Sequence, residues 1–263
     1  MVTDKPQDFL GRSLCRTPQG YTFGVSRDYE TRLCKVSSFG ELKGSNTLSF
    51  EKLDDNDTIL DESGQRRHRQ LLGRLLWLDR PDIKNAVCQL PTHVGTATTR
   101  DEINIKRLLR CLIGNPACNM IVGCNLDVPG IAGIPQGSVV VMTDAEWAGD
   151  VKNRRRYSGI AVCVEGSVEN TWYPVYASSK KQNMVCLSSG ESELMALVGG
   201  ICEGITTRDQ WSKLRKCSPG TIVLCTDSSA ALGFVTRKGA SRRTRHVDTK
   251  VTINKLPTAS RRS

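Results

Sequence analysis

Two apolar runs in the C-terminal half of the chain each end on an aspartate. VVVMT (139–143) is followed by Asp144, and TIVLCT (221–226) is followed by Asp227. Short apolar runs bounded by turn-forming residues are typical of buried strands, so strands are predicted at 138–143, 159–164, 172–177 and 221–226. The short gaps between the first three favour an antiparallel meander. The pattern therefore predicts a sheet that presents two carboxylates at strand ends.

A long helix is predicted in LSSGESELMALVGGICEGITTRDQWSKL (187–214), and a shorter one in SSAALGFVTRK (228–238). Ser188 and Glu191 have the spacing of a capping box. An apolar stripe follows at Leu194, Leu197, Ile201 and Ile205. Glycines at 199, 200 and 204 each weaken a helix by about 1 kcal/mol relative to alanine. Tertiary packing must therefore hold this helix in place.

The N-terminal part has a different hydrophobic pattern, in which helical periods predominate. A hairpin is predicted here, with a short strand at 20–26. Helical periodicity predicts helices at 27–39, 66–78 and 101–113, with a further helix that starts at Pro81. Glycine and proline accumulate in NLDVPGIAGIPQG, where no period survives. We therefore expect an N-terminal segment over 1–124, a linker over 125–137 and a second domain over 138–263.

Composition and charge narrow the function classes. The 263 residues carry a formal charge of +10, which fits a nucleic-acid partner, a membrane partner or simply a basic soluble surface. Charge alone does not choose between the three. Eleven cysteines include no C-x2-C pair and only three histidines accompany them, so zinc-finger spacings are excluded. No stretch approaches the roughly 18 apolar residues of a spanning helix. We expect a soluble, intracellular protein of the cytoplasm or nucleus, with no membrane partner.

Either aspartate alone is most simply a helix N-cap, but the pair has a third acid nearby. Glu191 belongs to the capping box, which leaves Glu193 on a different helical face beside the apolar stripe. Three converging carboxylates repel one another, and a hard divalent cation such as Mg²⁺ relieves that repulsion. Paired metal ions of this kind promote phosphodiester hydrolysis. Asp144, Glu193 and Asp227 are therefore the predicted metal ligands.

A series of motifs extends this hypothesis. In order, the chain contains TDAEWAGD (143–150), YSG (157–159), SSKKQ (178–182), LSSGESELMAL (187–197), CTDSSAAL (225–232) and RTRHVD (243–248). This series resembles the ribonuclease H portion of copia-type LTR-retrotransposon Pol polyproteins. RQLLGRLLWL (69–78), RPDIKNAVCQL (80–90) and KRLLRCLIGNP (106–116) are similar to the final segment of the reverse transcriptase of that family. The likeness covers almost the whole chain, more loosely before residue 65.

The resemblance implies an α/β (α+β) fold, with a ribonuclease H-like mixed β-sheet and flanking helices. A mainly helical segment that resembles the end of a reverse transcriptase, without the polymerase active site, would precede it. The implied activity is Mg²⁺- or Mn²⁺-dependent hydrolysis of the RNA strand of RNA·DNA hybrids, with Asp144, Glu193 and Asp227 as catalytic residues. An upstream polymerase region of a Pol polyprotein would be a further partner. The implied nucleic-acid-binding residues are Arg154, Arg155, Arg156, Lys180, Lys181, Ser228, Arg242, Arg243 and Arg245.

The chain departs from the family pattern near its end. The family has a fourth carboxylate and a fifth strand in a later element, and no such element follows TINKLPTASRRS. Asp248 matches a different motif and is not counted as catalytic. Two hypotheses therefore stand: a ribonuclease H impaired by the loss of one ligand, and a catalytically inactive, nucleic-acid-binding remnant of a transposon Pol polyprotein. Cleavage of an RNA·DNA hybrid with Mg²⁺ distinguishes them.

Overall fold

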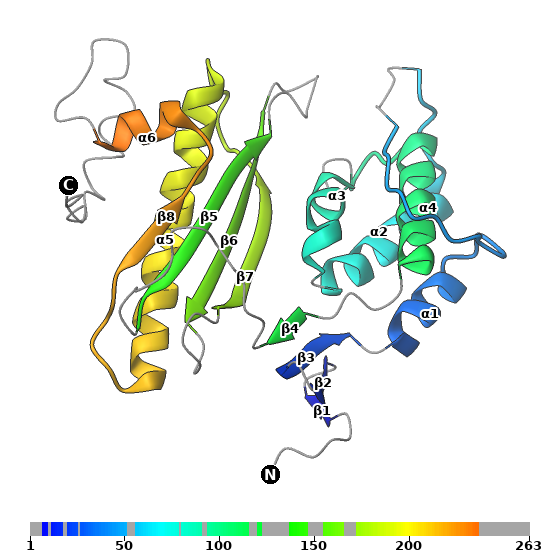
Figure 1. Cartoon of the computed structure of the whole chain (residues 1–263). Coiled ribbons are helices and arrows are strands. Elements are labelled where there is room, and N and C mark those ends of the chain that lie inside the picture. The colour runs from blue at the N-terminus through cyan, green and yellow to red at the C-terminus, as the bar shows by residue number, and fades with distance from the viewer. Residues whose placement is uncertain are drawn as a thin grey trace. The chain divides into compact units, whose positions relative to one another are not determined.

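The structure is a computed structural model of the whole chain, and it describes residues 7–9, 12–17, 20–25, 27–51, 56–78, 80–90, 94–115, 120–122, 137–146, 155–165 and 172–236. The chain divides into two compact units, residues 1–124 and 125–263. Figure 1 shows a sheet and helices in each. Within the described ranges, no helix is both long and apolar enough to cross a membrane.

The N-terminal unit contains a four-stranded antiparallel sheet, in the order β1-β2-β3-β4. Its strands are β1 (Gln7–Phe9), β2 (Arg12–Thr17), β3 (Gly20–Val25) and β4 (Met120–Val122). The sequence predicts a hairpin around β3 within a mainly helical segment. The antiparallel pairing of β2 with β3 fits that hairpin, and helices do cover more residues of this unit than strands. The extension of the hairpin to a four-stranded sheet is what the sequence does not predict. The other three strands are short or rich in polar residues. Such segments become strands through pairing with β3 and its neighbours, which local periodicity does not reveal.

Helices complete the N-terminal unit: α1 (Arg27–Val36), α2 (Glu62–Trp77), the 3₁₀ turn η1 (Pro81–Ile83), α3 (Lys84–Gln89) and α4 (Thr99–Gly114). These helices contribute leucine, isoleucine and valine side chains to one buried core, which includes Leu75, Val87 and Leu108. Helix α4 begins two residues earlier than its periodicity predicts because Thr98 and Asp101 form a reciprocal capping box.

The C-terminal unit is built on a mixed four-stranded sheet in the order β7-β6-β5-β8. Its strands are β5 (Val139–Glu146), β6 (Tyr157–Glu165), β7 (Trp172–Lys181) and β8 (Ile222–Cys225). The first three form the predicted antiparallel meander, whereas β8 runs parallel to β5. Helices α5 (Ser189–Arg215) and α6 (Ser229–Thr236) flank it. The predicted mixed α/β architecture of sheet and flanking helices is thus confirmed.

Helix α5 packs directly on β5 at two glycines, where any side chain would meet the strand. A Cβ atom on Gly200 would lie 2.5 Å from Cγ2 of Thr143, and one on Gly204 would lie 2.6 Å from Cγ2 of Val141. Leu194 and Leu197 of the apolar stripe are buried to 1% and 2% exposure. Close packing on the sheet therefore supplies the tertiary support that the glycines of this helix require.

Candidate metal centre

The register of two parallel strands brings Asp144 and Asp227 to the same edge of the sheet. Strands β5 and β8 pair from Val139 with Ile222 to Met142 with Cys225. Each aspartate stands two residues beyond the last of these pairs. Because parallel strands in register advance together at about 3.3 Å per residue, the two carboxylates arrive side by side. Both aspartates are exposed.

Glu193 comes from the first turns of α5. The Ser188 side chain accepts a hydrogen bond from the Glu191 backbone N–H at 3.1 Å, as an N-cap does. The Glu191 carboxylate accepts from the backbone N–H of Leu187 at 2.8 Å, instead of that of Ser188 as a standard capping box would have it. Glu191 is therefore engaged in starting the helix, and Glu193 is the acid that reaches the sheet edge.

The three carboxylates meet at one point. One oxygen each of Asp144, Glu193 and Asp227 can be chosen such that all three atoms lie within 4.8 Å of one another. This distance is well inside the roughly 8 Å beyond which side chains could not share a pair of metal ions about 3.5 to 4 Å apart. The structure therefore brings together the residues that the sequence singles out, while their catalytic and metal-binding roles stay predictions.

Electrostatics distinguish Glu193 from its neighbours. Burial raises the pKa of its carboxyl group, and the negative charges of Asp144 and Asp227 raise it further. The backbone N–H of Ala145 and the guanidinium of Arg156 act in the opposite direction. In addition, Oε2 of Glu193 is buried and has no hydrogen-bond partner within the described part of the chain. Such an orphaned oxygen is costly unless a cation satisfies it.

The donor set fits a hard divalent cation. Asp144, Glu193 and Asp227 offer carboxylate oxygens, the ligands that Mg²⁺ and Mn²⁺ prefer. When bound there, such an ion supplies Lewis-acid activation of water and stabilisation of a leaving oxygen. Both aspartates of this set are accessible to solvent.

A buried glutamine, Gln182, for which the sequence predicts no role, connects the strands of this site to α5. The side-chain amide of Gln182 donates to Oγ of Ser158 on β6 and to the backbone oxygen of Ser192 on α5, both at 2.9 Å. Its Oε1 accepts from the hydroxyl of Ser192 at 3.3 Å and from the thiol of Cys186 at 3.1 Å. Since Ser192 precedes Glu193, Gln182 holds the start of α5 against the sheet. Its sequence signal is its place at the end of the SSKKQ motif (178–182), directly after a strand.

The structure places the predicted nucleic-acid-binding residues in different settings. Lys180 is exposed and lies 3.6 Å from the carboxylate of Glu203. Lys181 is partly buried at the end of β7. The hydroxyl of Ser228 accepts from the backbone N–H of Ala231 at 3.1 Å, so Ser228 caps α6. Lys180 alone among these presents an exposed charge.

The arginines differ as well. Arg155 is exposed, whereas Arg156 is only 7% exposed and acts electrostatically on Glu193. Burial makes Arg156 a counter-charge of the acidic cluster more than a surface contact. The remaining predicted residues, Arg154, Arg242, Arg243 and Arg245, lie outside the described residues.

Fold and site together define a protein with a mixed α/β C-terminal unit and a cluster of acidic residues able to hold a metal ion. No known family profile matches the chain. The chain is similar to the secreted RxLR effector protein 161 of Plasmopara viticola, with 34% identity over 123 residues, which is 47% of this chain and 76% of the relative. The chain belongs to the family of this effector.

Two expectations are corrected by this relationship. The relative is a secreted effector and not a retrotransposon Pol polyprotein, so the predicted origin in a copia-type Pol protein is contradicted. The predicted intracellular location is contradicted as well, because the relative is a secreted protein. Short motifs and a positive charge describe local chemistry, and neither determines the source of a chain or where it acts.

Proposed function

We propose that the C-terminal unit is a metal-dependent ribonuclease that hydrolyses the RNA strand of RNA·DNA hybrids. The observation that carries the proposal is the convergence of Asp144, Glu193 and Asp227, with ligand oxygens within 4.8 Å of one another. Phosphodiester hydrolysis with Mg²⁺ or Mn²⁺ is the chemistry that such an open, all-carboxylate cluster supports.

The topology supports a ribonuclease H-like fold for this unit. Three antiparallel strands are followed by a long helix, α5, and then by a strand parallel to the first. This order delivers one carboxylate from each of β5 and the end of β8, and a third from the start of α5. Active sites of α/β proteins commonly occur where strand ends meet a helix in this way.

The residues of this chain would divide the work. Asp144 and Asp227 supply exposed ligands, and Glu193 supplies a partly buried one whose charge Arg156 offsets. Lys180 is an exposed cation suited to a phosphate of the substrate backbone. Selectivity for the RNA strand would depend on contacts to 2′-hydroxyl groups and on the A-like shape of the hybrid.

The direct test is incubation of the purified full chain with an end-labelled RNA·DNA hybrid and 5′-labelled DNA duplex of the same sequence, with Mg²⁺, with Mn²⁺ and with a chelator. We expect metal-dependent cleavage of the RNA strand only. Asp144→Asn should abolish it, and Asp209→Asn, which changes a carboxylate elsewhere on α5, should not. Metal-dependent cleavage that survives Asp144→Asn would overturn the assignment.

A non-catalytic role in nucleic-acid binding is the second candidate, and the charge of +10 is the observation that favours it. In that case the hybrid would be bound, with an affinity that falls steeply with salt, and would not be cut under any metal condition. The relative's description as a secreted effector adds the proposal that the protein acts after secretion. Detection of the chain in culture medium tests that part separately.

A further inference from the structure

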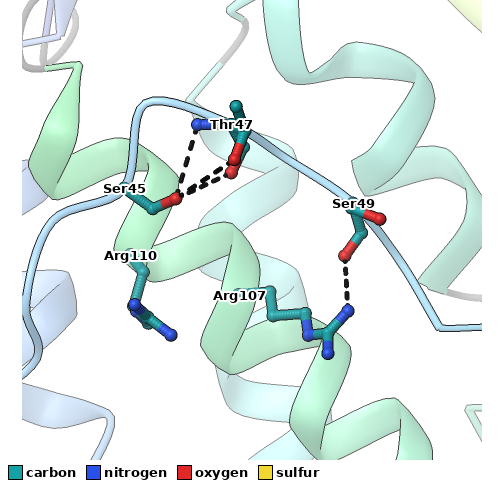
Figure 2. Close-up of a pocket in the computed structure, with 5 residues that line it drawn as sticks. All are labelled: Ser45, Thr47, Ser49, Arg107 and Arg110. Carbon is teal, nitrogen blue, oxygen red and sulfur yellow. Dashed lines mark hydrogen bonds between the residues drawn. The ribbon is translucent and has the colours of Figure 1, made fainter.

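A small polar pocket lies in the N-terminal unit, apart from the acidic cluster. It is lined by Ser45, Thr47, Ser49, Arg107 and Arg110 and has a volume of about 200 Å³. Figure 2 shows the two arginine side chains extending from α4 and the three hydroxyl residues along the segment that crosses this helix. Pockets for drug-sized molecules measure about 300 to 1,000 Å³, so a smaller group suits this one.

Both arginines are held in place by the crossing segment. They stand three positions apart on α4 and therefore on one face of the helix. Nε of Arg110 donates to the backbone oxygen of Lys43 at 3.0 Å, and Nη1 of Arg107 donates to the backbone oxygen of Ser49 at 3.0 Å. The two guanidinium groups are thus oriented before any ligand arrives, which lowers the entropy lost on binding.

The two arginines differ in how their charge is balanced. Arg107 pairs with the carboxylate of Glu51, which Arg100 shares. Arg110 forms no ion pair with any residue that the structure describes, and both of its Nη groups are without a hydrogen-bond partner there. The pocket lining contains no acidic side chain. An anchored guanidinium with two unused Nη groups and an uncompensated charge is complementary to an oxyanion.

Hydroxyl groups complete the lining. A turn in the crossing segment is closed by Oγ of Ser45, which donates to the backbone oxygen of Thr47 at 3.0 Å. The Ser49 hydroxyl makes no hydrogen bond within the described ranges, although its backbone oxygen is occupied by Arg107. Guanidinium and hydroxyl donors around a small volume are typical of contacts to phosphate oxygens.

We propose that this pocket binds a phosphate group, with Arg110 as its principal ligand and Ser49 and Thr47 as hydroxyl donors. The site belongs to the N-terminal unit and is independent of the acidic cluster, so it goes beyond the proposed hydrolysis. A free phosphate ion and a phosphodiester of a nucleic-acid backbone share this chemistry, and the experiment below separates the two sources.

The test follows the arginine Nε–H resonances of the full chain by NMR as inorganic phosphate is added. We expect the Arg110 signal to shift in a saturable manner. Arg110→Gln should weaken phosphate binding about tenfold or more, because it removes a charge-assisted pair of donors. Lys106→Gln removes one positive charge from an exposed position of the same helix and should change the affinity less than about twofold. Ser49→Ala should weaken binding while leaving the fold intact.

A second arm adds a short RNA·DNA hybrid to the phosphate-saturated Asp144→Asn protein, so that hydrolysis plays no part. Displacement of phosphate from Arg110 identifies a backbone phosphodiester as the source, and simultaneous binding of both identifies free phosphate. Equal losses in Arg110→Gln and Lys106→Gln would reduce the effect to general charge and overturn the proposal. So would the absence of any saturable shift. Neither result bears on hybrid cleavage, which is measured separately.

Discussion

Replacement of Glu193 by glutamine should make the metal-free protein more stable. At 4.8 Å two unit charges repel by about 1 kcal/mol in bulk water and by about 3 to 4 kcal/mol at an effective dielectric constant of 20. Because Asp144 and Asp227 are exposed, screening favours the lower value. Glu193→Gln removes two such repulsions, so we expect a gain of about 1 to 2 kcal/mol and a rise in Tm of about 2 to 8 °C.

Mg²⁺ should reverse the order of stability of the wild-type protein and the Glu193→Gln variant. A ligand at 100 times its Kd stabilises the folded state by about 2.7 kcal/mol. The wild-type protein would gain this amount with excess Mg²⁺, whereas Glu193→Gln has lost a charged ligand and would gain little. The variant is thus expected to be the more stable protein in chelator and the less stable one in Mg²⁺.

The contribution of Glu193 to folding stability depends on pH with a definite sign. The pKa of Glu193 is raised in the folded state, so its ionised form destabilises the fold relative to the unfolded chain. This penalty is complete above the raised pKa and disappears as the pH falls through that pKa to the ordinary value of a glutamate, about 4.3. The stability difference between the metal-free wild type and Glu193→Gln should therefore shrink on acidification.

Thermal unfolding followed by circular dichroism, in EDTA and in MgCl₂, measures all three effects. Glu203→Gln is the matched control, because Glu203 lies on the same helix and accepts a hydrogen bond from Tyr176 instead of facing the acidic cluster. That variant should show no gain in EDTA and a normal response to Mg²⁺. If Glu193→Gln is no more stable than the wild type in EDTA, or if Mg²⁺ raises both Tm values equally, the three carboxylates do not form a cation site.

Three further substitutions test the supports of the fold and site. Gln182→Leu leaves buried partners on β6 and α5 unsatisfied and should cost about 1 to 3 kcal/mol, measured by urea unfolding, with a loss of Mg²⁺-dependent stabilisation. Gly200→Ala inserts a methyl group between α5 and β5 and should cost about 1 to 3 kcal/mol in the same assay. Arg80→Leu leaves Glu30 buried without its 3.0 Å partner and should cost about 3 to 5 kcal/mol, whereas an unchanged unfolding midpoint would show that the pair contributes nothing.

Elements with a strong local signal could be read from the sequence. Helices α2, α4 and α5 show a sustained apolar period, and their starts carry side-chain caps at Asp61, Thr98 and Ser188. Each lies within a few residues of its predicted range. Strands β5 and β6 are apolar runs and are equally predictable from the sequence. Both extend beyond their predicted ranges through backbone pairing.

Pairing between distant segments is what the sequence did not reveal. Strand β4 pairs with β3, for example Val122 with Tyr21, although the two strands are far apart in the chain. The three residues of β4 contain no pattern that predicts this pairing. The same holds for the parallel register of Met142 with Cys225, on which the acidic cluster depends. The sequence identifies Asp144 and Asp227 because each follows an apolar run, and Glu193 because it lies beside the apolar stripe of α5. It does not reveal the distances between the three carboxylates.

The close approach of α5 to the sheet connects the fold to the site. A helix whose inward face carried full side chains at positions 200 and 204 would stand further from β5, since even a methyl group there would meet Thr143 or Val141 at 2.5 to 2.6 Å. Glu193 begins on this helix less than two turns before Gly200, and a glutamate side chain has limited reach. The glycines that weaken the helix by about 1 kcal/mol each are therefore the residues that allow Glu193 to meet Asp144. On this reasoning, the composition of α5 is set by a distance at the acidic cluster and not by helix propensity.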